Sequence, residues 1–74
     1  MEPLPPHERL AGWWERGRRF LGSDLAIMGG AMTWVSERHL VAAISNAGGF
    51  GVLACGAMDR HLLAAEIEAT AALT

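Results

Sequence analysis

Two glycine-containing segments are the places in this sequence where a small ligand could be held. Gly29–Val35 (GGAMTWV) follows the short apolar run Leu25–Met28, and Gly56–Met58 follows a second apolar run, Val52–Cys55. Small residues let backbone N–H groups approach a flat or anionic ligand, and the methionine and tryptophan of the first segment offer apolar surface. The alternative is a plain tight turn with two core side chains, because the segment matches neither the dinucleotide-binding nor the P-loop glycine pattern.

The three histidines are the usual candidates for a catalytic base, but their positions do not favour that role. His39 and His61 fall in the first turns of two predicted helices, away from the strand ends, and His7 lies in a proline-rich lead-in. We interpret all three as solvated residues rather than as bases.

Structural roles also account for the cysteine and the glutamates. Cys55 ends an apolar run at the end of the predicted strand where a ligand would bind. Its side chain could contact the ligand or be a small buried core residue, and we favour the second interpretation. Glu37 suits the positive end of a helix dipole, and Glu66 and Glu68 are expected on the exposed side of the last helix. A single cysteine excludes an internal disulfide and a cysteine zinc site. No catalytic residue and no metal ligand can be named.

The elements that must position these segments follow the pattern of a β-α-β unit. Leu25–Met28 and Val52–Cys55 are continuous apolar runs, as parallel strands buried on both faces are. A segment with helical spacing lies between them and carries one apolar face, made of Leu40, Ala43, Ile44 and Ala47. Parallel α/β proteins bind ligands at the carboxyl ends of their strands, which is where both glycine-containing segments fall.

Capping residues predict the boundaries of the central helix. Ser36 is a good N-cap for a helix over Glu37–Asn46, and Gly48 suits the left-handed position after its end. Gly49 and Gly51 then permit close backbone approach as the chain turns into the second strand. Because this glycine run precedes a strand, we interpret it as structural.

A helix is predicted on each side of the β-α-β unit. Met1–Pro6 reads as an extended lead-in to a helix over His7–Leu21, whose apolar stripe includes Leu10, Trp13 and Trp14. This helix is expected to pack over the end of a larger domain or against a partner subunit, with an aromatic lid over a ligand as the less favoured alternative. The last helix has Asp59 as its predicted N-cap. Its buried side is expected to contain Leu62, Leu63, Ile67, Thr70 and Ala71.

Composition gives no support for nucleic-acid or membrane binding. The 74 residues carry a formal charge of −2, and the cluster of Arg16, Arg18 and Arg19 is explained as a solvated helix face. No apolar stretch is long enough to span a bilayer, so the expected location is the cytoplasm. Two parallel strands alone lack neighbours on their outer edges, so the chain is expected to be a piece of a larger α/β domain.

Two stretches of the chain resemble a known enzyme family. Ile27–Val35 (IMGGAMTWV) and Leu40–Leu53 (LVAAISNAGGFGVL) are similar to the start of the nitronate monooxygenases, formerly called 2-nitropropane dioxygenases. That family is in turn similar to the FMN-dependent enoyl-acyl carrier protein reductases. The resemblance covers roughly Phe20–Thr74 and implies the N-terminal β-α-β-α portion of an FMN-binding (β/α)8 TIM barrel. Residues 1–21 would then be a lead-in and helix, and residues 22–74 the first two β/α units.

The resemblance also implies a cofactor site. Gly30, Ala31 and Met32 match family positions whose backbone lies along the isoalloxazine ring of FMN. In the commonest monooxygenase form, glutamine, alanine and proline precede the methionine, whereas Gly29, Gly30 and Ala31 stand there in this sequence. That difference brings the chain closer to the reductase-like members. The family's catalytic histidine and its phosphate-binding glycine loops belong to later strands, outside these residues.

The function implied is therefore oxidation of alkyl nitronates with molecular oxygen by an FMN enzyme. One alternative is an FMN-dependent enoyl-acyl carrier protein reductase, and another is a non-catalytic remnant or interaction module. The expected partner is a small molecule, either a nitronate or an enoyl thioester, and homo-oligomer formation is left open. The 74 residues by themselves are expected to be inactive and to bind FMN weakly or not at all.

Overall fold

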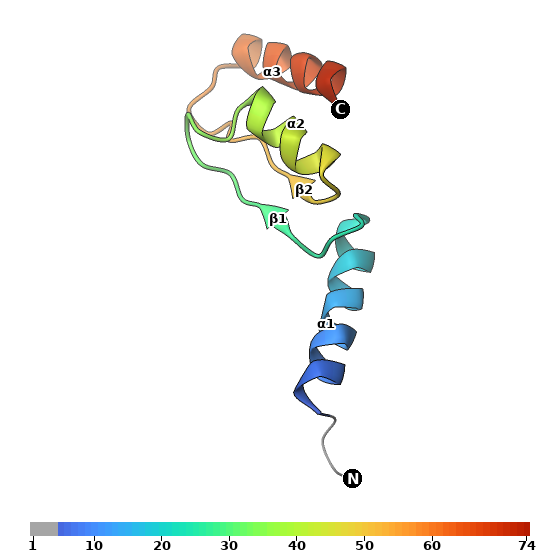
Figure 1. Cartoon of the computed structure of the whole chain (residues 1–74). Helices are drawn as coiled ribbons and strands as arrows, with labels where there is room; N and C mark the ends of the chain where they lie inside the picture. The colour runs from blue at the N-terminus through green and yellow to red at the C-terminus, as the bar shows by residue number, and fades with distance from the viewer. Residues whose placement is uncertain (1–4) are drawn as a thin grey trace.

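The computed structural model describes residues 5–74 and shows a small α/β arrangement in the order α1, β1, α2, β2, α3 (Figure 1). The helices are α1 (Pro6–Leu21), α2 (Arg38–Asn46) and α3 (Arg60–Leu73). The strands are β1 (Met28–Gly29) and β2 (Phe50–Gly51), which pair in parallel with Met28 opposite Phe50 and Gly29 opposite Gly51. The predicted β-α-β unit is therefore confirmed, and a third helix follows it.

Both strands are displaced from the predicted apolar runs. β1 begins at the last residue of the run Leu25–Met28, and β2 ends just before the run Val52–Cys55. Hydrogen bonds from Leu25 N to Gly48 O and from Phe50 N to Ile27 O, both 2.9 Å, align the first run with the glycine segment. After Gly29 the backbone leaves β1 and enters the loop. No strand therefore lies beside Val52–Cys55 among the described residues. The prediction of a strand over Val52–Cys55 is wrong for this reason.

Helix α2 lies directly on the sheet because glycines face it. A Cβ on Gly51 would stand 2.5 Å from the carbonyl oxygen of Val41, and one on Gly29 would collide with the Ile44 side chain. Side chains alternate along a strand, so Met28 and Phe50 face the other way. Both are exposed, and among residues 5–74 no element covers that face of the sheet.

The end of α2 matches the prediction. Gly48 has φ +98° and donates to Ser45 O, while Gly49 donates to Ile44 O. These two bonds form a Schellman motif, which satisfies carbonyls at the helix end.

The beginning of α2 differs from the prediction. Glu37, not Ser36, is the N-cap, and its carboxylate accepts hydrogen bonds from the backbone N–H groups of His39 and Leu40. The Ser36 side chain is used elsewhere, in the loop before the helix.

The buried faces of the two packed helices match the predictions in part, since Thr70 is buried and Ile44 packs against the sheet as expected, whereas other residues differ. In α2 the buried residues are Val41 and Ala42, whereas Ala43 and Ala47 are exposed. Helices α2 and α3 lie side by side (Figure 1). In α3, which is capped by Asp59 as predicted, the buried residues are Glu66 and Thr70. Three of the residues predicted to be buried are exposed, namely Leu62, Ile67 and Ala71.

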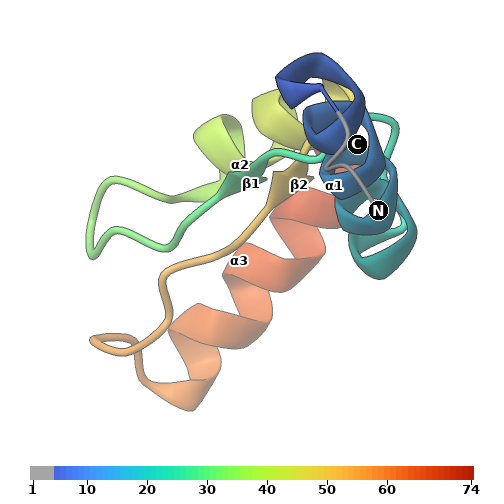
Figure 2. The same ribbon diagram turned by 90° about the horizontal axis from the view of Figure 1, so that it is seen from below.

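Helix α1 stands apart from the rest of the molecule. It extends away from the β1-α2-β2-α3 unit in Figure 1, and Figure 2 looks at the chain from the α1 end. It buries no residue, and it approaches the segment that leads to β1 at Gly17, whose Cβ would meet that of Ala26 at 2.9 Å. The radius of gyration is 15.8 Å, against about 11 Å for a compact domain of this length. The predicted lead-in over Met1–Pro6 lies mostly outside the described residues, and Pro6 already belongs to α1.

Candidate functional site

The loop that follows β1 is organised by a buried serine. The Oγ of Ser36 accepts a hydrogen bond from the backbone N–H of Met32 at 2.9 Å and donates to the carbonyl oxygen of Gly30 at 3.1 Å. The carbonyl oxygen of Ser36 accepts from the N–H of Ala54, beyond β2, at 3.1 Å. Ser36 is 2% exposed and Ala54 is also buried. One residue thus fixes the first loop and joins it to the chain that leaves the second strand.

The backbone of this loop leaves four amides free. The N–H groups of Gly30, Ala31, Thr33 and Trp34 donate to no acceptor within residues 5–74, whereas that of Met32 is bound to Ser36. A Cβ on Gly30 would meet nothing within 4 Å. Two of these donors, Gly30 and Ala31, follow β1 directly and lie beside open space, at the carboxyl end of a parallel strand. Such a surface suits a flat ligand with acceptor atoms at its edge.

The three residues predicted to bind the cofactor thus differ in what they can offer. Gly30 and Ala31 can donate backbone hydrogen bonds, but Met32 can contribute only its side chain, which is half exposed. The prediction named these three residues as a unit and did not include Ser36, which positions them.

The second predicted ligand segment, Gly56–Met58, is a turn. Met58 N donates to Cys55 O at 3.1 Å, and the space around Gly56 is open. Cys55 is exposed, so its interpretation as a buried core residue is wrong; the buried small residue is its neighbour Ala54. Ser36 links Ala54 to the first loop, so the two segments belong to the same end of the unit.

A family model for nitronate monooxygenase matches residues 18–74, which is more than half of the chain. The chain belongs to the nitronate monooxygenase family. The resemblance seen in the two sequence stretches is thereby confirmed, and the match includes both strands, α2, α3 and the loop around Ser36. No curated protein and no solved structure gave a significant match. Nitronate monooxygenase family members are oxidoreductases that are generally flavin-dependent.

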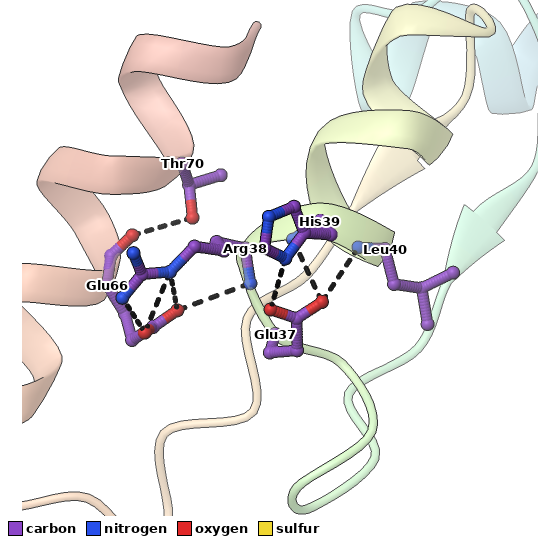
Figure 3. Close-up of polar contacts among 6 residues, drawn as sticks. All are labelled: Glu37, Arg38, His39, Leu40, Glu66 and Thr70. Carbon is purple, nitrogen blue, oxygen red and sulfur yellow. Dashed lines mark hydrogen bonds and ion pairs between the residues drawn. The ribbon is translucent and has the colours of Figure 1, made fainter.

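Helix α3 contributes a buried carboxylate to the same end of this family unit. Glu66 is 7% exposed, and its carboxylate accepts from Arg38 Nε at 3.1 Å, from Arg38 Nη2 and from the backbone N–H of Arg38 at 3.2 Å (Figure 3). The expectation that Glu66 faces solvent is therefore wrong, while Glu68 is exposed as expected. The bond to the backbone N–H satisfies a group at the N-terminus of α2 that has no partner within the helix.

The charges of this pair stabilise each other. Hydrogen bonds from Arg38 lower the pKa of Glu66, and the same bonds raise the pKa of Arg38. Thr70, one turn further along α3, donates its hydroxyl to the Glu66 carbonyl oxygen at 2.6 Å (Figure 3). Glu66 is thereby held from both its side chain and its backbone, so the start of α2 has a defined position against α3.

Glu37 and His39 form a second, exposed pair next to the first. Partial burial opposes ionisation of Glu37, but hydrogen bonds from the His39 ring and from the backbone of Leu40 and His39 outweigh it and lower the pKa of the carboxyl group. The side chain of His39 is exposed, and its ring lies against the Glu37 carboxylate (Figure 3). His7 and His61 are also exposed. The prediction that all three histidines are solvent-exposed is confirmed, but His7 lies in the first turn of α1 rather than in an extended lead-in.

The structure also contains an open apolar depression of about 490 Å³, but it lies on α1. His7, Leu10, Ala11 and Trp14 line it, far from the carboxyl ends of the strands (Figure 1). Size alone would make it the first ligand site to consider. We place the candidate site at the β1 loop instead, because that loop combines open space, free donors and the family match. Within residues 5–74 no group of three potential metal ligands comes together, and no helix is long and apolar enough to cross a membrane.

Proposed function

We propose that the protein is an FMN-dependent nitronate monooxygenase that oxidises alkyl nitronates with molecular oxygen. The observation that carries this proposal is the family match over residues 18–74. It is supported by the parallel β-α-β unit, whose first loop lies where α/β proteins hold their ligands. Bound FMN would accept electrons from the nitronate and deliver them to oxygen.

Gly30, Ala31 and Met32 would hold the flavin in this proposal. The free N–H groups of Gly30 and Ala31 can donate to acceptor atoms at the edge of the ring system, and the open space at Gly30 admits a flat group. The half-exposed side chain of Met32 supplies an apolar, polarizable contact. Ser36 keeps the three residues in this arrangement through its bonds to Met32 N and Gly30 O.

The uncovered face of the sheet supports the (β/α)8 barrel as the complete architecture. Barrel helices lie outside and strand side chains alternate between helix layer and interior. Gly29 and Gly51 contact α2, so Met28 and Phe50 would point into the barrel. In this proposal residues 22–74 supply the first two β/α units, and further strands would pair with the free edges of β1 and β2.

The test is to purify the intact protein as its gene encodes it and to measure bound FMN. The protein is then mixed without oxygen with either an alkyl nitronate or NAD(P)H while the flavin absorbance is followed. We expect stoichiometric FMN that is bleached by the nitronate and not by NAD(P)H. Bleaching by NAD(P)H alone would favour the enoyl reductase, to which Gly29, Gly30 and Ala31 bring the sequence closer. Absence of FMN would overturn the proposal.

A matched pair of variants tests the position of the site. Gly30→Val fills the open space at the loop, so FMN content should fall while the protein still folds, because a Cβ at this position meets no atom within 4 Å. Gly12→Ala adds atoms to equally open space on α1 and should leave FMN content unchanged. Full FMN retention in Gly30→Val would show that the flavin does not lie against this loop.

A further inference from the structure

The loop after β1 contains a residue whose type conflicts with its backbone conformation. Trp34 has φ +62°, and it is the only non-glycine residue among residues 5–74 with a positive φ. Bulky L residues rarely adopt this left-handed conformation, because the side chain crowds the following carbonyl. Glycine or asparagine would occupy it with less strain.

The surrounding hydrogen bonds hold Trp34 in this conformation. The carbonyl oxygen of Met32 accepts from the N–H groups of Val35 at 2.9 Å and of Ser36 at 2.8 Å. Both hydrogen bonds span Trp34 and so close a turn that contains it. Ser36 itself is buried and bonded to Met32 N and Gly30 O. Strain that is held in place by a buried network is typical of ligand-binding positions, where the side chain has a role beyond folding.

The exposed side chains of the turn show what that role can be. Met32, Trp34 and Val35 are 51%, 65% and 54% exposed, so three large apolar side chains gather in four consecutive residues. They lie directly after the free amides of Gly30 and Ala31. A ligand bound at those amides would therefore have apolar surface next to it.

We propose that Trp34 is a specificity-determining residue that, with Met32 and Val35, contacts the alkyl chain of the substrate. This inference rests on the proposed function, in which a nitronate reacts at a flavin held by Gly30 and Ala31. The polar head of the substrate would lie at the flavin and its chain along the apolar turn. Each methylene buried in this way raises affinity about fourfold, as the free energy of burying a CH₂ group gives.

The experiment compares ligands of increasing chain length in the intact protein and in two variants, Trp34→Gly and Trp34→Asn. Straight-chain primary nitroalkanes serve as binding probes, with dissociation constants from thermal shifts, and the corresponding nitronates give kcat/KM. In the wild type both quantities should improve with each added methylene. In both variants this dependence on chain length should become weaker, because the indole that contacts the alkyl chain is gone. The Tm of the variants should not fall, because glycine and asparagine adopt the positive φ with less strain. Phe20→Ala, which removes an aromatic side chain that is 87% exposed on α1, should keep the wild-type dependence.

Two results would overturn the inference. The first is that affinity and kcat/KM depend on chain length in both variants as they do in the wild type. The second is a marked loss of Tm in both variants, which would mean that the Trp34 side chain packs against the protein itself. If the wild type holds FMN and turns over nitronates in either case, only this inference fails. If it holds no FMN but nitroalkane affinity still rises with chain length and falls in the variants, the alkyl subsite stands and the nitronate function fails.

Discussion

Helix α1 and the β1-α2-β2-α3 unit differ in how closely they are packed, as one glycine from each region illustrates. Gly12, in α1, has open space around it, whereas Gly51, in β2, lies against the Val41 carbonyl of α2. α1 buries no residue, while α2 and α3 bury Val41, Glu66 and Thr70 among others. The comparison teaches that the close packing of the described residues is concentrated in the β1-α2-β2-α3 unit, and that the apolar side chains of α1 have no packing partner among residues 5–74.

The largest expected effect comes from adding one methyl group in each region. Gly51→Ala should destabilise the protein by about 1–3 kcal/mol, because overpacking against a backbone carbonyl forces α2 away from the sheet. Gly12→Ala should stabilise it by about 0.5–1 kcal/mol, because alanine has the better helix propensity and meets no atom. Urea unfolding of both variants, with slopes compared, measures the two changes.

Opposite signs for these two variants are the critical result. If Gly12→Ala also destabilises, α1 packs closely against another part of the protein or against a second subunit, and the contrast between the regions would have to be abandoned.

A second, smaller difference is expected between two glutamate–arginine contacts. Glu66→Gln removes a buried charge that Arg38 and the N-terminus of α2 both use, so Tm should fall clearly at neutral pH. Glu15→Gln is the control, since Glu15 pairs with Arg18 and Arg19 on the surface of α1. Its loss should cost no more than about 0.5 kcal/mol. Equal losses would mean that the Arg38 pair is no better protected from water than the α1 pairs.

The Glu66 contact also predicts how stability depends on pH. Its pKa is lowered below the ordinary value of 4.5 by Arg38, so the unfolded chain binds protons more readily than the folded one in that range. The stabilisation is fully present above pH 4.5 and is lost as pH falls through the lowered pKa of the folded state. Thermal melts from neutral pH downward should show this loss in the wild type and a smaller one in Glu66→Gln. A wild-type slope retained in the variant would assign the acid sensitivity to other carboxylates.

Local signals predicted the parts of the fold that depend on neighbouring residues. Asp59 caps α3 and Gly48 ends α2 because cap and turn chemistry needs only residues a few positions apart. The parallel pairing was also predictable from the two apolar runs, although its register was not, because register depends on where β1 leaves the sheet.

The site was less predictable, since its organising residues act over longer distances. Ser36 and Glu37 are both good caps, and the choice between them depends on Met32 N and Gly30 O, which the folded loop brings to Ser36. Glu66 looked like a solvent-facing residue because its partner, Arg38, is 28 positions away. Single-residue preferences cannot detect the role of Ser36 in the loop or that of Glu66 as the partner of Arg38. The family resemblance did locate the loop itself.

The smallest expected effect is on the unit when most of α1 is removed. Deleting residues 1–17, which precede the family match, should leave the Tm and FMN content of the remaining protein nearly unchanged, because α1 buries no side chain. In the intact protein, amide hydrogens of α1 should exchange far faster than those of α2, since a helix of 16 residues without packing is marginal in water. Protection of α1 equal to that of α2, together with a lower Tm after deletion, would show that Leu10, Trp13 and Trp14 are covered in the intact protein. The two regions would then form one cooperative structure, and the exposed stripe of α1 would be an interface.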